Sequence, residues 1–397
     1  MPRRRQARLW IATIGGGAAA VSMICIGLVN RPTTTPKAPV GHAAALGEAS
    51  SVAALNQALR EGDPQALGIF QQRVVPVQPG QRHALSDDEA AAWVETLSYL
   101  RTGYFKFSPP ARATAAMVAG AILDKFSPEP APACWTEALA PVHDIFSACL
   151  ADVDSNVRYI ALGEVSRFWV WMPGRSLVPV EEEVLGSWKE SFHQPVIRSL
   201  AIKDVRTRIA AIDCLGHLPI DAAAAPAIAY LGDKESVDAR RQTLVSFAHR
   251  PNLLTDDLLL TRLHDSDSSI RETATLVLKA RGLNQEQISL GGLMVSPKPQ
   301  QRASVISLIK DRTDIDPVVW LLQLSHDADE TVRMRAVEAL AAQKSQTVSV
   351  KRRIAEMARS DSSESVRKTA SKFIPSADET ASLPPLPGSL SLSPKAN

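Results

Sequence analysis

Pairs of aspartates two residues apart recur from residue 152 onward, and their type and spacing suggest metal chemistry. Asp152-x-Asp154-x-Asn156 has the opening spacing of a calcium-binding loop between two helices. Such a loop also needs glycine at its sixth position and a bidentate glutamate at its twelfth. The chain has Val157 and Gly163 there. The same glycine is missing from the two later pairs, Asp265/Asp267 and Asp327/Asp329. We therefore expect no calcium site, and helix capping explains these acids better.

The histidines have no pattern typical of a metal centre. None of the eight is followed by glutamate; they are His42, His83, His143, His193, His217, His249, His264 and His326. His264 and His326 each precede an aspartate near the end of an expected helix, where the helix dipole favours a cation. The chain also has no phosphate-binding glycine loop and no nucleophile elbow. We predict no catalytic, cofactor-binding or metal-binding residue.

The four cysteines leave two interpretations open. Cys25 lies in an apolar stretch, and Cys134 and Cys149 are near enough in sequence to pair in an oxidising compartment. The alternative, which we favour for these two and for Cys214, is that they are small buried apolar residues.

Aromatic residues gather in two places. They are Phe168, Trp169 and Trp171 in one group, and Trp93, Tyr99, Tyr104, Phe105 and Phe107 in the other. Exposed aromatic clusters anchor binding partners. We expect core packing for both groups, with partner anchoring as the alternative.

Charge is distributed unevenly along the 397 residues. The net charge is +2, but the first forty residues carry six basic residues and no acid, so the rest of the chain is mildly acidic. A phosphate-backbone binder normally shows a basic footprint. We therefore expect protein partners and no nucleic acid.

The N-terminus predicts a membrane anchor. Leu9 to Val29 contains no charge and follows four arginines, and about 20 apolar residues suffice to cross a bilayer. The positive-inside rule then places the N-terminus in the cytoplasm and the body on the other side, periplasmic in a bacterium. The alternative is a cleaved signal peptide and a secreted soluble body.

These signals divide the chain into five segments. We expect a basic segment with a transmembrane anchor (1–30), a Pro/Thr-rich linker (31–42), an irregular helical part (43–149), regular helical repeats (150–374) and a disordered Pro/Ser-rich tail (375–397). The fold class is all-α.

An arginine recurs at a nearly constant interval and marks the repeats. It stands at Arg208, Arg240, Arg271, Arg302, Arg333 and Arg367, with gaps of 32, 31, 31, 31 and 34 residues. Such a period is typical of a solenoid. Apolar residues stand one position before the arginine and three, six and seven after it, as in Ile270, Ala274, Val277 and Leu278, with Gln301 as a polar exception. Earlier copies surround Arg158 and, more faintly, Arg112. The pattern predicts stacked helical hairpins.

The motif D-x-D-x-x-(V/I)-R-x-x-A-x-x-x-L resembles the HEAT and HEAT-like (armadillo-type) repeat family over about 150–374. The resemblance implies that the aspartate caps the second helix of each hairpin and meets the arginine in a polar ladder. The residues concerned are Asp152, Arg158, Asp265, Arg271, Asp327, Arg333, Asp361 and Arg367. Ile202, Lys234 and Ser296 replace the acid before Arg208, Arg240 and Arg302, so we expect interruptions there.

Two enzyme families are similar in their repeats. Deoxyhypusine hydroxylase binds di-iron through His-Glu pairs, which this chain lacks, and phycobilin lyases need a chromophore pocket that the sequence does not identify. Shared repeats do not carry activity over. We therefore expect a membrane-anchored scaffold for protein–protein interaction without catalysis. The alternative is an enzyme or enzyme subunit with a pocket between Ala43 and Trp188.

Overall fold

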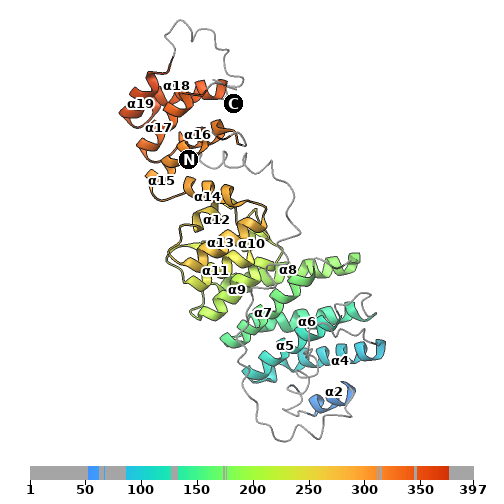
Figure 1. The fold of residues 1–397 in the computed structure, drawn as a ribbon. Helices are drawn as coiled ribbons and strands as arrows, with labels where there is room; N and C mark the ends of the chain where they lie inside the picture. The colour runs from blue at the N-terminus through green and yellow to red at the C-terminus, as the bar shows by residue number, and fades with distance from the viewer. Residues whose placement is uncertain are drawn as a thin grey trace, which may run out of the picture. The chain divides into compact units, whose positions relative to one another are not determined.

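The computed structural model describes most of the repeat region (Figure 1). The described residues are 52–61, 67, 86–126, 133–172, 175, 177–310, 312, 315–343 and 347–374. They form helices joined by turns, with no strand among them. The expected anchor, linker and C-terminal tail lie outside these residues. None of the described helices combines the length and the apolar character that crossing a bilayer requires.

The chain divides into two compact units, residues 1–283 and 284–397. The first contains α2 (Val52–Arg60), α4 (Asp87–Gly103), η2 (Tyr104–Lys106), α5 (Pro109–Phe126), α6 (Trp135–Leu150), α7 (Ser155–Trp171), α8 (Pro179–Ser199), α9 (Val205–His217), α10 (Asp221–Ala224), η4 (Ala225–Leu231), α11 (Val237–Ser246), α12 (Asp256–Arg262) and α13 (Ser268–Ala280). The second contains α14 (Gln285–Met294), α15 (Pro299–Ile309), α16 (Pro317–Leu324), α17 (Glu330–Ala341), α18 (Val348–Ser360) and α19 (Glu364–Ser371).

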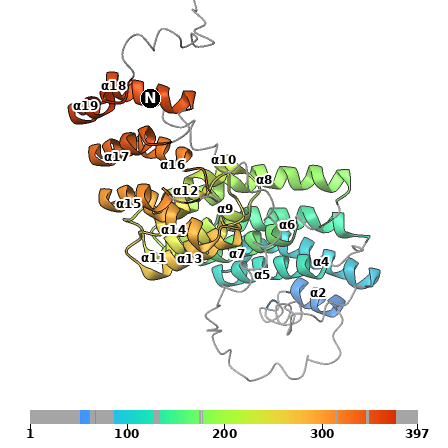
Figure 2. The same ribbon diagram turned by 45° about the horizontal axis from the view of Figure 1, so that its top comes forward.

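Each unit is a stack of helical hairpins. In the first unit the helices that carry the recurring arginine, α5, α7, α9, α11 and α13, pack on one another in chain order, and α4, α6 and α8 do the same beside them (Figures 1 and 2). In the second unit α15, α17 and α19 pack in order, and α16 contacts α18. We call α5, α7, α9, α11, α13, α15, α17 and α19 the arginine helices.

The core follows the predicted apolar stripe with one correction. Ile270, Ala274 and Leu278 of α13 are fully buried, as are the corresponding residues of α17. The stripe therefore runs at i, i+4 and i+8. The position at i+7 is less regular, because Leu308 and Phe373 are 51% and 41% exposed. Phe373 lies beyond the end of α19, so helical spacing no longer applies to it.

The helix boundaries also follow local signals. Ser86 accepts a hydrogen bond from the Glu89 amide at the start of α4, and Asp316 caps α16 ahead of Pro317. After α13 the chain turns at Gly282, whose φ of 95° suits glycine, and the Leu283 amide bonds back to Leu278. The first unit ends at this turn.

Most of the aromatic residues are part of the core. Trp93, Tyr104, Phe168 and Trp169 are buried, which agrees with the favoured interpretation. Phe105 is different, because 87% of its surface is exposed. Cys134, Cys149 and Cys214 are free thiols in the structure, and burial raises the pKa of Cys149 to about 12. Cys25 lies outside the described residues.

Candidate interaction surface

The recurring arginine has the same register in every arginine helix from α7 onward. It stands four residues after the N-cap residue in each case; these residues are Asp154, Asp204, Ser236, Asp267, Lys298, Asp329 and Ser363. An N-cap side chain binds the free amides of the first turn, as Asp329 does for Thr331 and Val332 at 2.9 and 3.2 Å. The arginine is therefore in the second turn, on the side that faces the neighbouring hairpin.

The capping expectation needs a correction. The first aspartate of each motif, such as Asp327, does not cap the helix; the second one, Asp329, does. Asp327 instead accepts a hydrogen bond from the Asp329 amide at 2.8 Å, which fixes the turn before the helix. The same bond recurs at Asp152, Asp265 and Asp361.

Within its own motif, the arginine side chain donates a hydrogen bond to a main-chain carbonyl. Arg333 donates to the carbonyl of Asp327 at 2.9 Å, six residues earlier. Arg271, Arg302 and Arg367 make the same bond at 2.8, 2.7 and 2.6 Å, and Arg158 also does so. The pairs inferred from the resemblance, such as Asp327/Arg333, are therefore in contact through a carbonyl and not through an ion pair.

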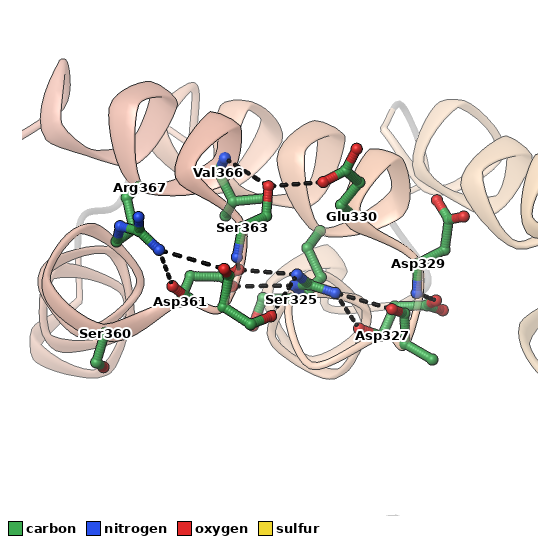
Figure 3. Close-up of polar contacts among 12 residues, drawn as sticks. Ser325, Asp327, Asp329, Glu330, Ser360, Asp361, Ser363, Val366 and Arg367 are labelled. Carbon is green, nitrogen blue, oxygen red and sulfur yellow. Dashed lines mark hydrogen bonds and ion pairs between the residues drawn. The ribbon is translucent and has the colours of Figure 1, made fainter.

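The carboxylate pairs with the arginine of the preceding hairpin. Figure 3 shows the polar contacts around Asp361 and Asp327. Arg302 holds Asp327 through two hydrogen bonds of 2.7 Å, and Arg333 holds Asp361 through bonds of 2.9 and 2.8 Å. The ladder thus connects consecutive hairpins. We call each such arginine–aspartate pair a rung of the ladder. Two further rungs are Arg112–Asp152, at 2.6 and 3.0 Å, and Arg240–Asp265, at 3.0 Å.

These rungs are largely shielded from water. The side chains of Arg333 and Asp361 are 10% and 6% exposed. Burial alone would raise the pKa of Asp361, but the bonds from Arg333 and from the Ser363 amide outweigh it and hold the pKa below its usual value. Asp152 has the same shift, with Arg112, the Asp154 amide and the Tyr104 hydroxyl as its donors.

The interruptions fall one hairpin earlier than the motif suggested. The acid is replaced by Ile202, Lys234 and Ser296. The preceding arginines, Arg158, Arg208 and Arg271, are the ones that lack a carboxylate among the described residues. Arg240, whose own motif has Lys234, donates to the Asp265 carboxylate at 3.0 Å. The interruptions are displaced by one hairpin because each aspartate carboxylate pairs with the arginine of the preceding hairpin and not with the arginine of its own.

A second arginine series escaped the sequence analysis. Arg250 donates to the carbonyls of Leu215, Gly216 and Leu218 at 2.9, 3.2 and 2.9 Å, and so satisfies the free carbonyls at the end of α9. Arg281 does the same for Ala248, after α11, at 2.9 Å.

The signal for this series was present in the sequence. Arg250, Arg281 and Arg312 are 31 residues apart, and each follows a ladder arginine by ten residues. Arg312 pairs with Glu286 at 2.8 Å. Through their bonds to main-chain carbonyls, Arg250 and Arg281 each connect one arginine helix to the end of the preceding arginine helix.

Ser166, Asp213 and His217 bring together the residue types of a hydrolytic site, but with different connections. The Ser166 hydroxyl donates to the Asp213 carboxylate at 2.6 Å, and Ser166 is 3% exposed. His217 Nδ1 lies 3.2 Å from Ser166 and 3.0 Å from the main-chain oxygen of Asp213. A catalytic histidine would stand between the serine and the carboxylate. Here the Asp213 carboxylate accepts the hydrogen bond of the Ser166 hydroxyl directly. It also accepts hydrogen bonds from the side chains of Gln242 and Ser246 of α11, at 2.8 and 2.7 Å.

The polar clusters of the first unit thus join α7, α9 and α11 to one another. Within the described part of the chain, no group of three or more histidines, cysteines or acids is placed to hold a metal ion. The solvent-exposed residues include large apolar side chains just before or at the first residue of the arginine helices. Phe105, Val153 and Val205 are 87%, 90% and 45% exposed. Such side chains are candidates for partner contacts.

Among known proteins, only solved structures give matches to the chain. No protein-family model and no curated protein matches the chain. Solved structures do match. One is a chain from the study of how Kap95p binding induces the switch loops of RanGDP to adopt the GTP-bound conformation, with 12% identity, 90% of this chain covered and a TM-score of 0.32. The protein spans about half (55%) of that chain.

A second match comes from the study of tubulin recruitment and assembly by microtubule polymerases with TOG domain arrays. The identity is 12%, the TM-score is 0.28, and the match covers 82% of this chain and 75% of the other. Both TM-scores are below 0.5, so these matches carry no argument about this chain. The stacked hairpins themselves confirm the resemblance to HEAT-like repeats at the level of architecture.

Proposed function

We propose that this HEAT-like α-solenoid is a scaffold that binds other proteins, held at a membrane by Leu9 to Val29 with its body outside the cytoplasm. The single observation that supports binding over catalysis is how the polar side chains are used. The ladder, the Arg250 series and the Asp213 cluster each connect neighbouring arginine helices. Large apolar side chains remain exposed at the turns, where a partner can bury them.

The anchor is proposed from the sequence. It depends on the uncharged stretch Leu9 to Val29, the arginines before it and the Pro/Thr-rich linker after it. Display outside the cytoplasm follows from the positive-inside rule. Protease added to intact cells should degrade the body of an anchored, outward-facing protein and leave cytoplasmic markers intact. Protection of the body would contradict this topology, and a mature N-terminus near His42 or Ala45 would indicate a secreted form.

The scaffold proposal is tested by crosslinking the full chain in intact cells and identifying what it captures. We expect the same protein partners in repeated experiments, and their loss when Phe105 and Val153 are replaced by aspartate. As a matched control, Val348 of α18 is 62% exposed and is replaced in the same way. A chain that captures no specific protein, or that turns over a small molecule, would contradict the proposal.

A further inference from the structure

Arg208 differs from the other ladder arginines. The seven others, Arg112, Arg158, Arg240, Arg271, Arg302, Arg333 and Arg367, each donate to a carbonyl of the preceding turn. The Arg208 guanidinium makes no hydrogen bond and no ion pair with any described residue. Its helix nevertheless begins normally, because Asp204 accepts from the Thr207 amide at 3.1 Å. Arg208 is thus in the ladder register with a free guanidinium.

Arg208 has no carboxylate partner because of the residue that the next hairpin places in the aspartate position. Two residues before the N-cap of α11 stands Lys234, where α13 has Asp265 in the same position. Asp265 neutralises Arg240, whereas the corresponding position in the hairpin after Arg208 holds Lys234, which is exposed and carries a second positive charge. Two neighbouring cations without a counter-charge favour the binding of an anion.

Further cations stand at the start of α9, close in sequence to Arg208. Arg206 lies over the Tyr159 ring, 5.6 Å from its centre, and Lys203 is exposed in the same turn. We call Lys203, Arg206, Arg208 and Lys234 the basic edge. Stacking on an aromatic ring holds a guanidinium in place and leaves its donors available.

Most acids near the basic edge are already engaged. Asp204 binds the amides of α9, Asp233 pairs with Arg262 at 2.7 Å, and Asp238 pairs with Arg241 at 3.0 Å. Glu235, next to Lys234 in the sequence, makes no ion pair with a described residue. The edge therefore keeps an excess of positive charge.

Apolar side chains flank the same cations. Val153, Val205 and Val237 stand at the starts of successive arginine helices and are 90%, 45% and 36% exposed. A ligand that contacts both the cations and the valines must carry carboxylates and apolar groups together. A protein segment has both, whereas a nucleic acid backbone offers phosphates and would leave the valines uncovered.

We propose that the basic edge binds an acidic segment of a partner protein. One carboxylate of that segment lies on Arg208 as Asp265 lies on Arg240, and a neighbouring apolar side chain packs on Val205 and Val237. A planar guanidinium binds a carboxylate through two parallel hydrogen bonds, which the paired rungs of this ladder already do. This inference rests on the proposed scaffold function and names the chemistry of its partner.

The geometry is tested first within the protein. Lys234→Asp places a carboxylate where the ladder has one in α13, so it should pair with Arg208 and raise the melting temperature of the full chain by about 2–4 °C. The gain should vanish when Arg208→Gln is added. Lys351→Asp, the same charge change at an exposed site of α18, serves as the control. If Lys234→Asp gives no gain beyond that control, Arg208 is not in a ladder position and the proposal fails.

Binding is tested with a fluorescein-labelled peptide of alternating glutamate and leucine, by anisotropy at low salt with the full chain in detergent. We expect saturable binding that salt weakens. Binding should be about 10- to 100-fold weaker for Arg208→Gln and for Lys234→Asp, and unchanged for Lys351→Asp. A peptide with glutamine in place of glutamate should not bind.

Several outcomes would overturn the inference. They are no binding of the acidic peptide, equal binding by Arg208→Gln, or tighter binding of a duplex RNA of similar length. None of them refutes the scaffold function, since a partner is then free to use another face. The scaffold function fails separately, when crosslinking in cells returns no specific protein.

Discussion

Replacing Arg333 by alanine removes the most highly connected side chain of the second unit. Its guanidinium makes two bonds to Asp361, two to the carbonyls of Asp327 and Ala328, and one to Ser362, all between 2.8 and 3.2 Å. The Asp361 side chain is 6% exposed, so the substitution leaves a buried carboxylate without its counter-charge. Breaking a buried ion pair in this way costs about 3–5 kcal/mol. Lysine at this position keeps the charge but not the forked geometry, so Arg333→Lys should have an intermediate effect.

The assay must separate the two units, because the unfolding of such an array need not be two-state. Trp320 is the one tryptophan after residue 283, and it is 5% exposed in the core of the second unit. In protein labelled with 5-fluorotryptophan, its fluorine resonance reports the unfolding of this unit in urea. Trp320→Phe assigns the resonance.

The control lies on the same helix. Arg335 is exposed and makes no ion pair within the described residues, so Arg335→Ala should change stability by less than about 0.5 kcal/mol. We expect the Trp320 transition to move to much lower urea in Arg333→Ala and to stay in place in Arg335→Ala. Equal, small shifts in both variants would refute the reasoning that the ladder holds the stack together.

Other predictions concern packing, pH and the second arginine series. Ala336→Leu should destabilise the second unit by about 1–3 kcal/mol, because Ala336 is fully buried between helices; an unchanged urea midpoint would count against the register. Gly216→Ala should cost a similar amount in the first unit, since a Cβ there would lie 2.5 Å from that of Ser246; circular dichroism in urea measures it. Arg250→Gln should cost about 1–3 kcal/mol by leaving the end of α9 without its donor, and a cost no larger than that of an exposed arginine would contradict this. Because the folded-state pKa of Asp361 is lowered, its contribution is present above pH 4 and lost as the pH falls below it; Asp361→Asn should remove that acid-dependent loss, and an identical acid profile would refute the assignment.

The repeat architecture was predictable because each hairpin carries its own signals. The 31-residue interval, the stripe of Ile270, Ala274 and Leu278, and the cap at Asp316 before Pro317 are local features, and the structure contains all of them. The interval between Arg158 and Arg208, 50 residues, is longer than the regular one. Helices α7 and α8, of 17 and 21 residues, account for most of it.

The partners of the ladder residues were not predictable from the motif. Spacing within a motif suggests contact within that motif, so Asp327 was assigned to Arg333, six residues later. The rise between stacked hairpins instead brings the aspartate to Arg302, 25 residues earlier, and only tertiary packing decides between them. The role of Arg250 was missed for a related reason, since three of its acceptors are main-chain carbonyls, which leave no mark in the sequence, and its carboxylate partner Asp221 is 29 residues away.

The central claim is that the ladder aspartate pairs with the arginine of the preceding hairpin. A comparison of two coupling energies tests this pairing most directly. Double-mutant cycles of Arg302 with Asp327 and of Asp327 with Arg333, read from the Trp320 resonance, measure the two alternatives on a shared residue. We predict a coupling of about 1–3 kcal/mol for Arg302 with Asp327, and a much smaller one for Asp327 with Arg333, which uses the Asp327 carbonyl. The opposite order would show that the ladder closes within each hairpin and would contradict the account.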